Sequence, residues 1–122
     1  MRAAYVFKVR FGLETLPGVE TDPRAFDATV ELEADPPGEG DWLFFRDALW
    51  RGEVNDERYA RELAEEWLSV PVESVSFREL RTDGEYLDAL KAEIADNLDL
   101  FNSEAVDETL TKYFGSSIHV RP

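Results

Sequence analysis

The sequence contains no cysteine and a single histidine, His119. Without cysteine, the chain has no disulfide bond, no thiol nucleophile and no cysteine ligand for a metal ion. Long apolar runs are missing too, because no segment approaches the 18 residues that a membrane-spanning helix needs. Residues 1–11 carry three charges and no apolar run of signal-peptide length. These absences exclude a membrane-spanning helix and lead us to expect a cytoplasmic protein.

Lysine is also scarce, with three lysines beside ten arginines and 27 acidic residues. The formal net charge is −14, well beyond the magnitude of about 2–8 that is usual for a small domain. Such a chain repels itself at low salt. In about 1 M salt the Debye length falls to about 3 Å, and most of this repulsion is screened. The composition therefore predicts a protein adapted to a salt-rich cytoplasm.

No motif of a known catalytic or nucleotide-binding kind occurs, whether a glycine-rich dinucleotide loop, a P-loop, an HExxH zinc site or an EF-hand. His119 has Ser116 and Ser117 as near neighbours, but adjacent residues of a strand point to opposite faces and do not form a relay. Glu62, Glu65 and Glu66 fall on or near one helix face, and a hydrated acidic face explains them better than a metal or acid–base site. We therefore assign no catalytic residue, no metal site and no cofactor, and an enzyme stays the third alternative.

The chain has the length of one domain, covering residues 1–122. Residues 3–13 and 26–33 alternate between apolar and polar side chains, which predicts two half-buried strands. Their short separation favours an antiparallel hairpin. In that hairpin we expect Lys8 and Arg10 to face Glu31 and Glu33.

The second half of the chain contains patterns typical of both helices and strands. Residues 56–69 have the three- and four-residue apolar spacing of a helix, with Asn55 as its N-cap. Residues 72–81 read as a strand, and Thr82 with Glu85 fits a capping box that begins another helix. A last helix is expected before Gly115, and a short strand at residues 117–120. The order predicts an α+β fold, with an antiparallel or mixed sheet of about four strands covered on one face by three to four helices.

Large apolar side chains are densest in residues 41–56, DWLFFRDALWRGEVND. Residues 42–45 fit a short strand or the first turn of a helix, and residues 46–51 favour a helix with Gly52 as its C-cap. Trp42, Phe45 and Trp50 cover too wide an arc to share one helix face. We therefore expect that some of them are core residues and that one is exposed.

Arginines gather in the same part of the chain. Arg46 and Arg51 lie in the aromatic segment, and Arg78 and Arg81 follow later. Such residues can contact phosphate or RNA, helped by stacking on a tryptophan. They can equally pair with local acids, Arg46 with Asp47 being one case. Nucleic-acid binding through charge weakens steeply with salt, which argues against the first interpretation in a salt-rich cell.

The segment Leu49-Trp50-Arg51 resembles the naming tripeptide of the LWR-salt proteins, small proteins of halophilic archaea. The loop ADPPGEG at residues 34–40, FRELRTD at 77–83 and KYFGSSIHV at 112–120 carry the resemblance along nearly the whole chain. The resemblance implies life in high salt. It implies no activity and supplies no catalytic residue.

Aromatic and arginine side chains are the types that protein interfaces enrich. We therefore expect a non-enzymatic module that binds an unknown protein partner or forms a homo-oligomer. The candidate interaction patch consists of Trp42, Phe45, Arg46, Trp50 and Arg51. The alternative is an RNA- or nucleotide-binding protein in which Arg78 and Arg81 add phosphate contacts.

Overall fold

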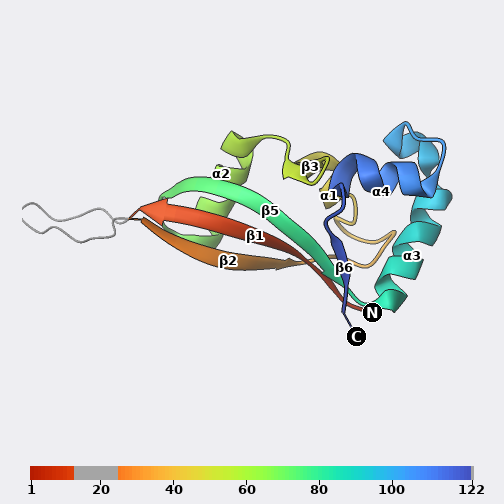
Figure 1. Ribbon diagram of the computed structural model, residues 1–122, viewed down its shortest axis with the longest axis horizontal. Coiled ribbons are helices and arrows are strands. Elements are labelled where there is room, and N and C mark those ends of the chain that lie inside the picture. The colour runs from red at the N-terminus through yellow and green to blue at the C-terminus, as the bar shows by residue number, and fades with distance from the viewer. Residues whose placement is uncertain (13–24, 122) are drawn as a thin grey trace, which may run out of the picture.

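The computed structural model describes residues 1–12 and 25–121, in which strands and helices alternate in an α+β order. The strands are β1 (Ala3–Gly12), β2 (Ala25–Glu33), β3 (Leu49–Trp50), β4 (Glu53–Val54), β5 (Val72–Thr82) and β6 (Ile118–Val120). The helices are α1 (Phe44–Ala48), α2 (Glu57–Leu68), α3 (Gly84–Ala95) and α4 (Val106–Phe114), with a 3-10 turn η1 (Leu98–Phe101) before α4. The predicted α+β class is confirmed (Figure 1).

A four-stranded mixed sheet forms the base of the fold, in the order β2-β1-β5-β6. β1 runs antiparallel to β2 and β5, whereas β6 runs parallel to β5. The alternation in β1 directs Tyr5, Phe7 and Val9 into the core, where each is at most 3% exposed. The helices and the small β3–β4 hairpin cover this apolar face (Figure 1).

The register of the β1–β2 hairpin differs from our prediction. Lys8 lies opposite Thr29, and Arg10 lies opposite Asp27. Lys8 Nζ is 3.5 Å from Asp27 Oδ2, while Arg10 pairs with Glu73 of β5 at 3.6 Å. The predicted pairs with Glu31 and Glu33 are wrong, because an antiparallel register that joined them would differ by four residues from the observed one. A shift by an even number of residues keeps the same side chains on the core face, so the apolar pattern cannot detect it.

Two predicted helix caps also move by one residue. Asp56, not Asn55, caps α2, because its Oδ1 accepts the backbone N–H of Tyr59 at 3.1 Å. Asp83, not Thr82, caps α3 by accepting the N–H of Tyr86 at 2.7 Å. A carboxylate at the N-cap also interacts favourably with the helix dipole, which the uncharged amide of Asn55 and hydroxyl of Thr82 cannot match.

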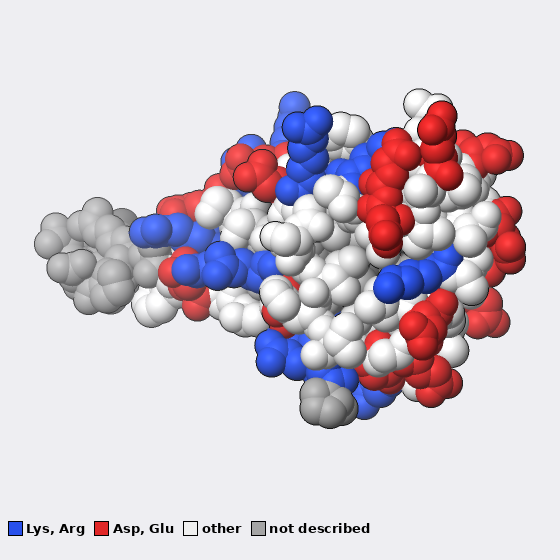
Figure 2. Space-filling view, turned by 45° about the vertical axis from the view of Figure 1, so that its right-hand side comes forward, with Lys and Arg blue, Asp and Glu red and all other residues white. Residues whose placement is uncertain are grey.

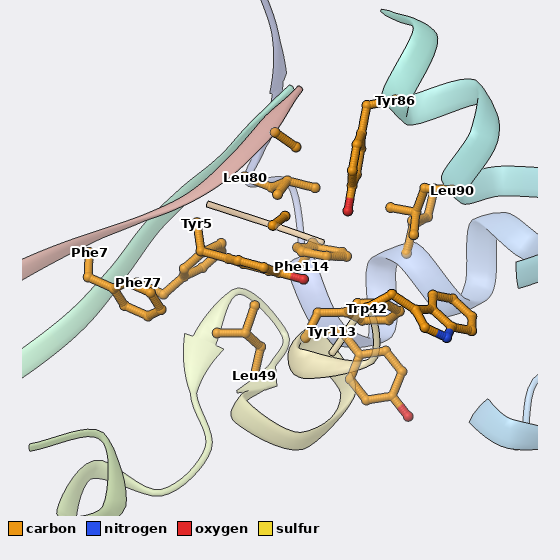
Figure 3. Packing of buried hydrophobic residues seen from close by; sticks show 14 of the residues in the cluster. Tyr5, Phe7, Trp42, Leu49, Phe77, Leu80, Tyr86, Leu90, Tyr113 and Phe114 are labelled. Atoms are coloured by element: carbon orange, nitrogen blue, oxygen red, sulfur yellow. The ribbon is translucent and has the colours of Figure 1, made fainter. Parts of the chain in front are cut away.

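The core is built from aromatic side chains of distant segments. Phe45, Phe101 and Phe114 are the largest of the fully buried side chains. The rings of Phe45 and Phe114 lie 5.1 Å apart, and Phe114 also faces Tyr5 of β1 at 6.5 Å (Figure 3). Helix α4 is thereby fixed between the sheet and the segment that contains α1.

A buried tyrosine fixes the loop after β2 to α3. The hydroxyl of Tyr86 donates to the backbone carbonyl of Asp35 at 2.8 Å. Burial, with a smaller contribution from the Asp35 carboxylate, raises the pKa of Tyr86 to about 12. The phenol is therefore a neutral hydrogen-bond donor at physiological pH, and its role is structural.

Candidate functional site

The aromatic segment folds differently from the helix predicted for residues 46–51. Helix α1 ends at Ala48, and Leu49 and Trp50 form β3, which pairs with β4. The two residues between these strands, Arg51 and Gly52, both have positive φ angles, 54° and 83°. Two positive φ angles in a two-residue loop define a type I′ turn. Gly52 therefore belongs to a hairpin turn and does not cap a helix.

This hairpin turn lies against the C-terminal end of α4. The last four carbonyl groups of a helix have no partner within the helix. The backbone N–H of Arg51 donates to the Lys112 carbonyl at 2.7 Å, and that of Gly52 donates to the Tyr113 carbonyl at 2.9 Å. The residues that follow α4 provide the other two donors. The backbone N–H of Gly115 donates to the Thr111 carbonyl, and that of Ser117 donates to the Phe114 carbonyl. All four terminal carbonyls of α4 are thus satisfied, two of them by the turn.

The two backbones approach closely enough to require glycine on both sides. A Cβ atom on Gly52 would lie 2.8 Å from the Phe114 carbonyl oxygen. A Cβ atom on Gly115 would lie 2.9 Å from the Arg51 carbonyl oxygen, and the φ angle of Gly115 is +60°. The β3–β4 turn and the end of α4 therefore form one interlocked backbone unit.

The side chains carried by this unit point in different directions. Leu49 is fully buried, whereas Trp50 is 46% exposed. The Trp50 ring meets Tyr113 edge to face, with centroids 6.1 Å apart and an interplanar angle of 82°. The guanidinium of Arg51 lies 5.7 Å from the Trp50 ring centroid, within cation–π range.

Arg46 joins the same surface from α1. Its Nε lies 3.3 Å from Asp47 Oδ1, the local ion pair that the sequence suggested. Burial raises the pKa of the Tyr113 hydroxyl, and the nearby Arg46 charge offsets part of this rise. Arg46, Trp50 and Arg51 therefore lie around Tyr113, which is itself buried. We call these three side chains, with the Tyr113 ring that supports them, the Trp50 surface.

The predicted interaction patch is thus divided between core and surface. Trp42 is 8% exposed and Phe45 is fully buried. Both pack against Phe101, with ring centroids 6.1 and 5.6 Å away. The prediction that some of the three aromatics are core and one is exposed agrees with this arrangement. Trp42 and Phe45 therefore leave the patch. Tyr113, which the sequence did not suggest, is also buried at 8% exposed, and its contribution is to support the Trp50 ring.

The arginines of the RNA-binding alternative do not form one cluster. Arg81, on β5, pairs with Glu31 of β2 and with Glu79 of its own strand. Arg78 is exposed, and no ion pair of Arg78 is present among the described residues. The local pair Arg58–Glu62 is present at 3.6 Å. Among the residues that the structure describes, Arg51 has no ion pair, and its guanidinium lies over the Trp50 ring.

A second polar cluster lies on the sheet face that the helices leave open. The single histidine finds a partner that the sequence did not reveal, because His119 Nδ1 lies 2.7 Å from Glu79 Oε2. Glu79 is only 13% exposed. Burial alone would raise its pKa, but the hydrogen bonds and charges of Arg81 and His119 outweigh burial and lower it. The ion pairs of this cluster connect β2, β5 and β6, so their role is to stabilise the sheet.

Near this cluster the surface has a hollow of about 440 Å³. Arginine and carboxylate side chains in equal number line it, with Ala3 and Ala4 between them. Among the described residues, no group of three histidine or carboxylate side chains is arranged to hold a metal ion. None of the described helices has the length and apolar character to cross a membrane.

Comparison with known protein families gives one result. The family model of the LWR-salt proteins matches residues 1–122, the whole chain. The chain belongs to the LWR-salt family. No curated protein matches it. No solved structure matches it either.

The residues of the LWR tripeptide have three separate structural roles in this family member. Leu49 fills the core beneath the hairpin. Trp50 lies on Tyr113 and exposes almost half of its surface. Arg51 takes the first position of the type I′ turn and donates its N–H to α4. Of the two apolar side chains in the tripeptide, that of Leu49 is buried and that of Trp50 is exposed.

Proposed function

We infer that this LWR-salt protein is a non-enzymatic interaction module of a salt-rich cytoplasm, and that it contacts another protein or a second copy of itself through the Trp50 surface. The observation that carries the proposal is the 46% exposure of Trp50 on an interlocked frame. Its backbone is fixed by the β3–β4 pairing, and its ring is supported by Tyr113. An aromatic side chain held in one orientation loses little conformational entropy when a partner covers it.

The composition of the Trp50 surface supports protein contact. Tryptophan, tyrosine and arginine are the residues that most often dominate the binding energy of protein interfaces. Apolar contact keeps its strength in concentrated salt, whereas contact between exposed charges is screened. A binding site built around one tryptophan is therefore suited to the conditions that the composition predicts.

The distribution of charge supports the high-salt part of the proposal. Residues 84–114 contain eight acidic and two basic side chains. In Figure 2, Asp and Glu side chains gather at the end of the molecule formed by α3, η1 and α4. Such a concentration of like charge destabilises a fold at low ionic strength, and salt relieves it.

RNA or nucleotide binding is a second candidate, favoured by the contact between Arg51 and Trp50. An arginine on a tryptophan forms a platform on which a base can stack. Arg78 and Arg81 do not extend this platform, because Arg81 is engaged with Glu31 and Glu79. A site with few phosphate contacts gains little affinity from charge in molar salt.

The two candidates are separated by affinity capture of the tagged protein from native lysate in about 2 M KCl, with and without nuclease. The matched variants are Trp50→Ala and Tyr59→Ala, since Tyr59 is an equally exposed aromatic residue on α2. We expect a protein or a second copy of the chain to be retained after nuclease treatment, with Tyr59→Ala retaining it and Trp50→Ala losing it.

Recovery of RNA that disappears when Arg46 and Arg51 are both replaced by alanine would favour the second candidate. Equal retention by Trp50→Ala and the unaltered protein would overturn the proposed site. Both variants must first show the melting curve of a folded protein.

A further inference from the structure

Strand β2 forms one edge of the sheet (Figure 1). β2 pairs with β1 along its full length, and in the described part of the chain it has no strand on its other side. The pairing with β1 runs without a register shift, whereas the β1–β5 pairing contains two. β2 is therefore a long, regular edge strand whose outer backbone groups are oriented to pair with another strand.

Natural proteins usually protect such edges with charged side chains, proline, a bulge or a very short strand. The opposite edge follows this rule, because β6 has only three residues and the rest of that edge is β5, whose pairing with β1 contains two register shifts. β2 has nine residues, and its sequence AFDATVELE contains no proline, lysine or glycine. Since the pairing with β1 has no bulge either, charge is the one usual protection that this edge has, and it is carried by Asp27, Glu31 and Glu33.

The core-side face of β2 is also incompletely covered. On β1 the corresponding residues Tyr5, Phe7 and Val9 are at most 3% exposed. On β2, Phe26 is 39% exposed, and Val30 and Leu32 are only half-buried. A strand placed beside β2 would cover these side chains and extend the apolar face of the sheet.

Charge decides what kind of strand fits. The open face of β2 carries Asp27, Glu31 and Glu33, all exposed. On its paired side, β2 lies beside a strand with basic side chains on this face, and Lys8 of β1 lies 3.5 Å from Asp27. A second copy of β2 would place carboxylates against carboxylates, which is unfavourable for directly opposed strand residues.

We propose that the free edge of β2 binds an extended segment of another protein, in which basic side chains alternate with apolar ones. Main-chain hydrogen bonds to the edge provide the affinity, and the alternation selects the segment. The apolar side chains cover Phe26, Val30 and Leu32. The basic ones face Glu33 and join the pairs that Asp27 and Glu31 make with Lys8 and Arg81. This site shares no residue with the Trp50 surface and does not depend on the proposed function.

A suitable probe is a fluorescent peptide with the β1 sequence AAYVFKVRFG, which has the required alternation. Its control is the same peptide with glutamate in place of lysine and arginine. Binding is measured by fluorescence anisotropy in about 0.5 M KCl, where charge pairs at short range still contribute. The site of binding is read from amide hydrogen exchange of residues 25–33 and 3–12 in the full chain.

Two matched protein variants test the edge itself. Thr29→Lys and Ser76→Lys each place a lysine beside Lys8, because Lys8 lies between Thr29 on β2 and Ser76 on β5. Only the first lies on the free edge. We expect Thr29→Lys to weaken binding of the basic peptide at least fivefold and Ser76→Lys to leave it within twofold. Amide hydrogen exchange is measured on the unaltered protein, so this part of the test does not depend on whether a variant folds.

The proposal requires that the basic peptide slows amide exchange in β2 while β1 keeps its own protection. Lack of binding, equal binding of the glutamate peptide, or protection confined to residues outside β2 would each overturn it. Loss of protection in β1 would also overturn it, because the peptide would then have replaced β1 and not joined the edge.

Discussion

The backbone N–H of Arg51 donates to the carbonyl oxygen of Lys112 at 2.7 Å, across 61 positions of sequence. This bond and its neighbour from Gly52 to Tyr113 make the β3–β4 turn the cap of α4. Unpaired terminal carbonyls lower the stability of a helix end, so the turn stabilises α4 as well as itself. The Trp50 surface is therefore positioned by backbone contacts and not by its own side chains.

Gly52→Ala tests this interlock. The φ angle of Gly52 is +83°, and a Cβ atom would lie 2.8 Å from the Phe114 carbonyl oxygen. We expect a loss of at least about 1–3 kcal/mol in the free energy of unfolding, the usual cost of a strained backbone position. The control is Gly84→Ala, where a Cβ atom meets nothing within 4 Å. Urea unfolding should show the control unchanged within about 0.5 kcal/mol, and equal losses in both variants would disprove the interlock.

Trp50→Ala and Trp42→Ala compare the exposed and the buried tryptophan. Trp42 is 8% exposed, so its truncation should cost about 3–5 kcal/mol. Trp50 is 46% exposed and loses mainly its contact with Tyr113, for which we expect about 1 kcal/mol. Chemical unfolding of both variants measures the difference. A loss for Trp50→Ala as large as that for Trp42→Ala would show that Trp50 is a core residue.

Salt should stabilise the fold. From the net charge of −14, we expect a lower melting temperature in about 0.1 M than in about 2 M KCl. Glu65 and Glu66 lie near the end of α2, whose last turn contains no basic residue. Replacing both with glutamine should raise the melting temperature in low salt, by the equivalent of about 0.3–1 kcal/mol each, and less in high salt.

Differential scanning calorimetry at the two salt concentrations provides this comparison. Equal melting temperatures of the unaltered protein in both salts would contradict the role of charge. An equal gain for the glutamine variant in both salts would show that its effect is not electrostatic.

Glu79→Gln tests the polar cluster on the open sheet face. Because Arg81 and His119 lower the pKa of Glu79 in the folded protein, the ionised carboxylate contributes stability above the ordinary glutamate value of 4.5. This contribution is lost as the pH falls through the lowered pKa. We therefore expect the variant to be less stable near pH 7 and the difference to shrink below pH 4.5.

The measurement is urea unfolding across this pH range, with Glu62→Gln as the control. Glu62 is exposed and pairs with Arg58 across one turn of α2, a pair worth about 0.3–0.5 kcal/mol. A stability difference for Glu79→Gln that does not change with pH would show that the Glu79 charge makes no contribution.

The sequence predicted most of the fold because its elements are strongly periodic. The alternation in β1 and β2 and the apolar stripe of α2 are local patterns, and each is present in the structure. Register and caps were less predictable. The four-residue shift that brings Lys8 opposite Thr29 leaves the apolar faces unchanged, so no pattern signals it.

The candidate site was predictable only in part. The sequence identified Trp50, Arg46 and Arg51 by residue type, but it placed residues 46–51 in a helix. The reason is that Arg51 adopts a positive φ angle, which arginine rarely does without tertiary contacts. Those contacts come from Lys112 and Tyr113, far away in the sequence. The Glu79–His119 pair is equally distant, at 2.7 Å between segments 40 positions apart.

The most direct test of the central claim uses the protein partner recovered by affinity capture, or a second copy of the chain. It measures how binding of that partner depends on Trp50 and on salt concentration. Affinities of the unaltered protein, Trp50→Ala and Tyr59→Ala are determined by titration from about 0.5 to about 3 M KCl. We expect the unaltered protein and Tyr59→Ala to bind equally at every salt concentration, and Trp50→Ala to bind at least about tenfold more weakly, the loss expected of a central interface residue. Binding that falls steeply with salt and is unaffected by Trp50→Ala would contradict the account.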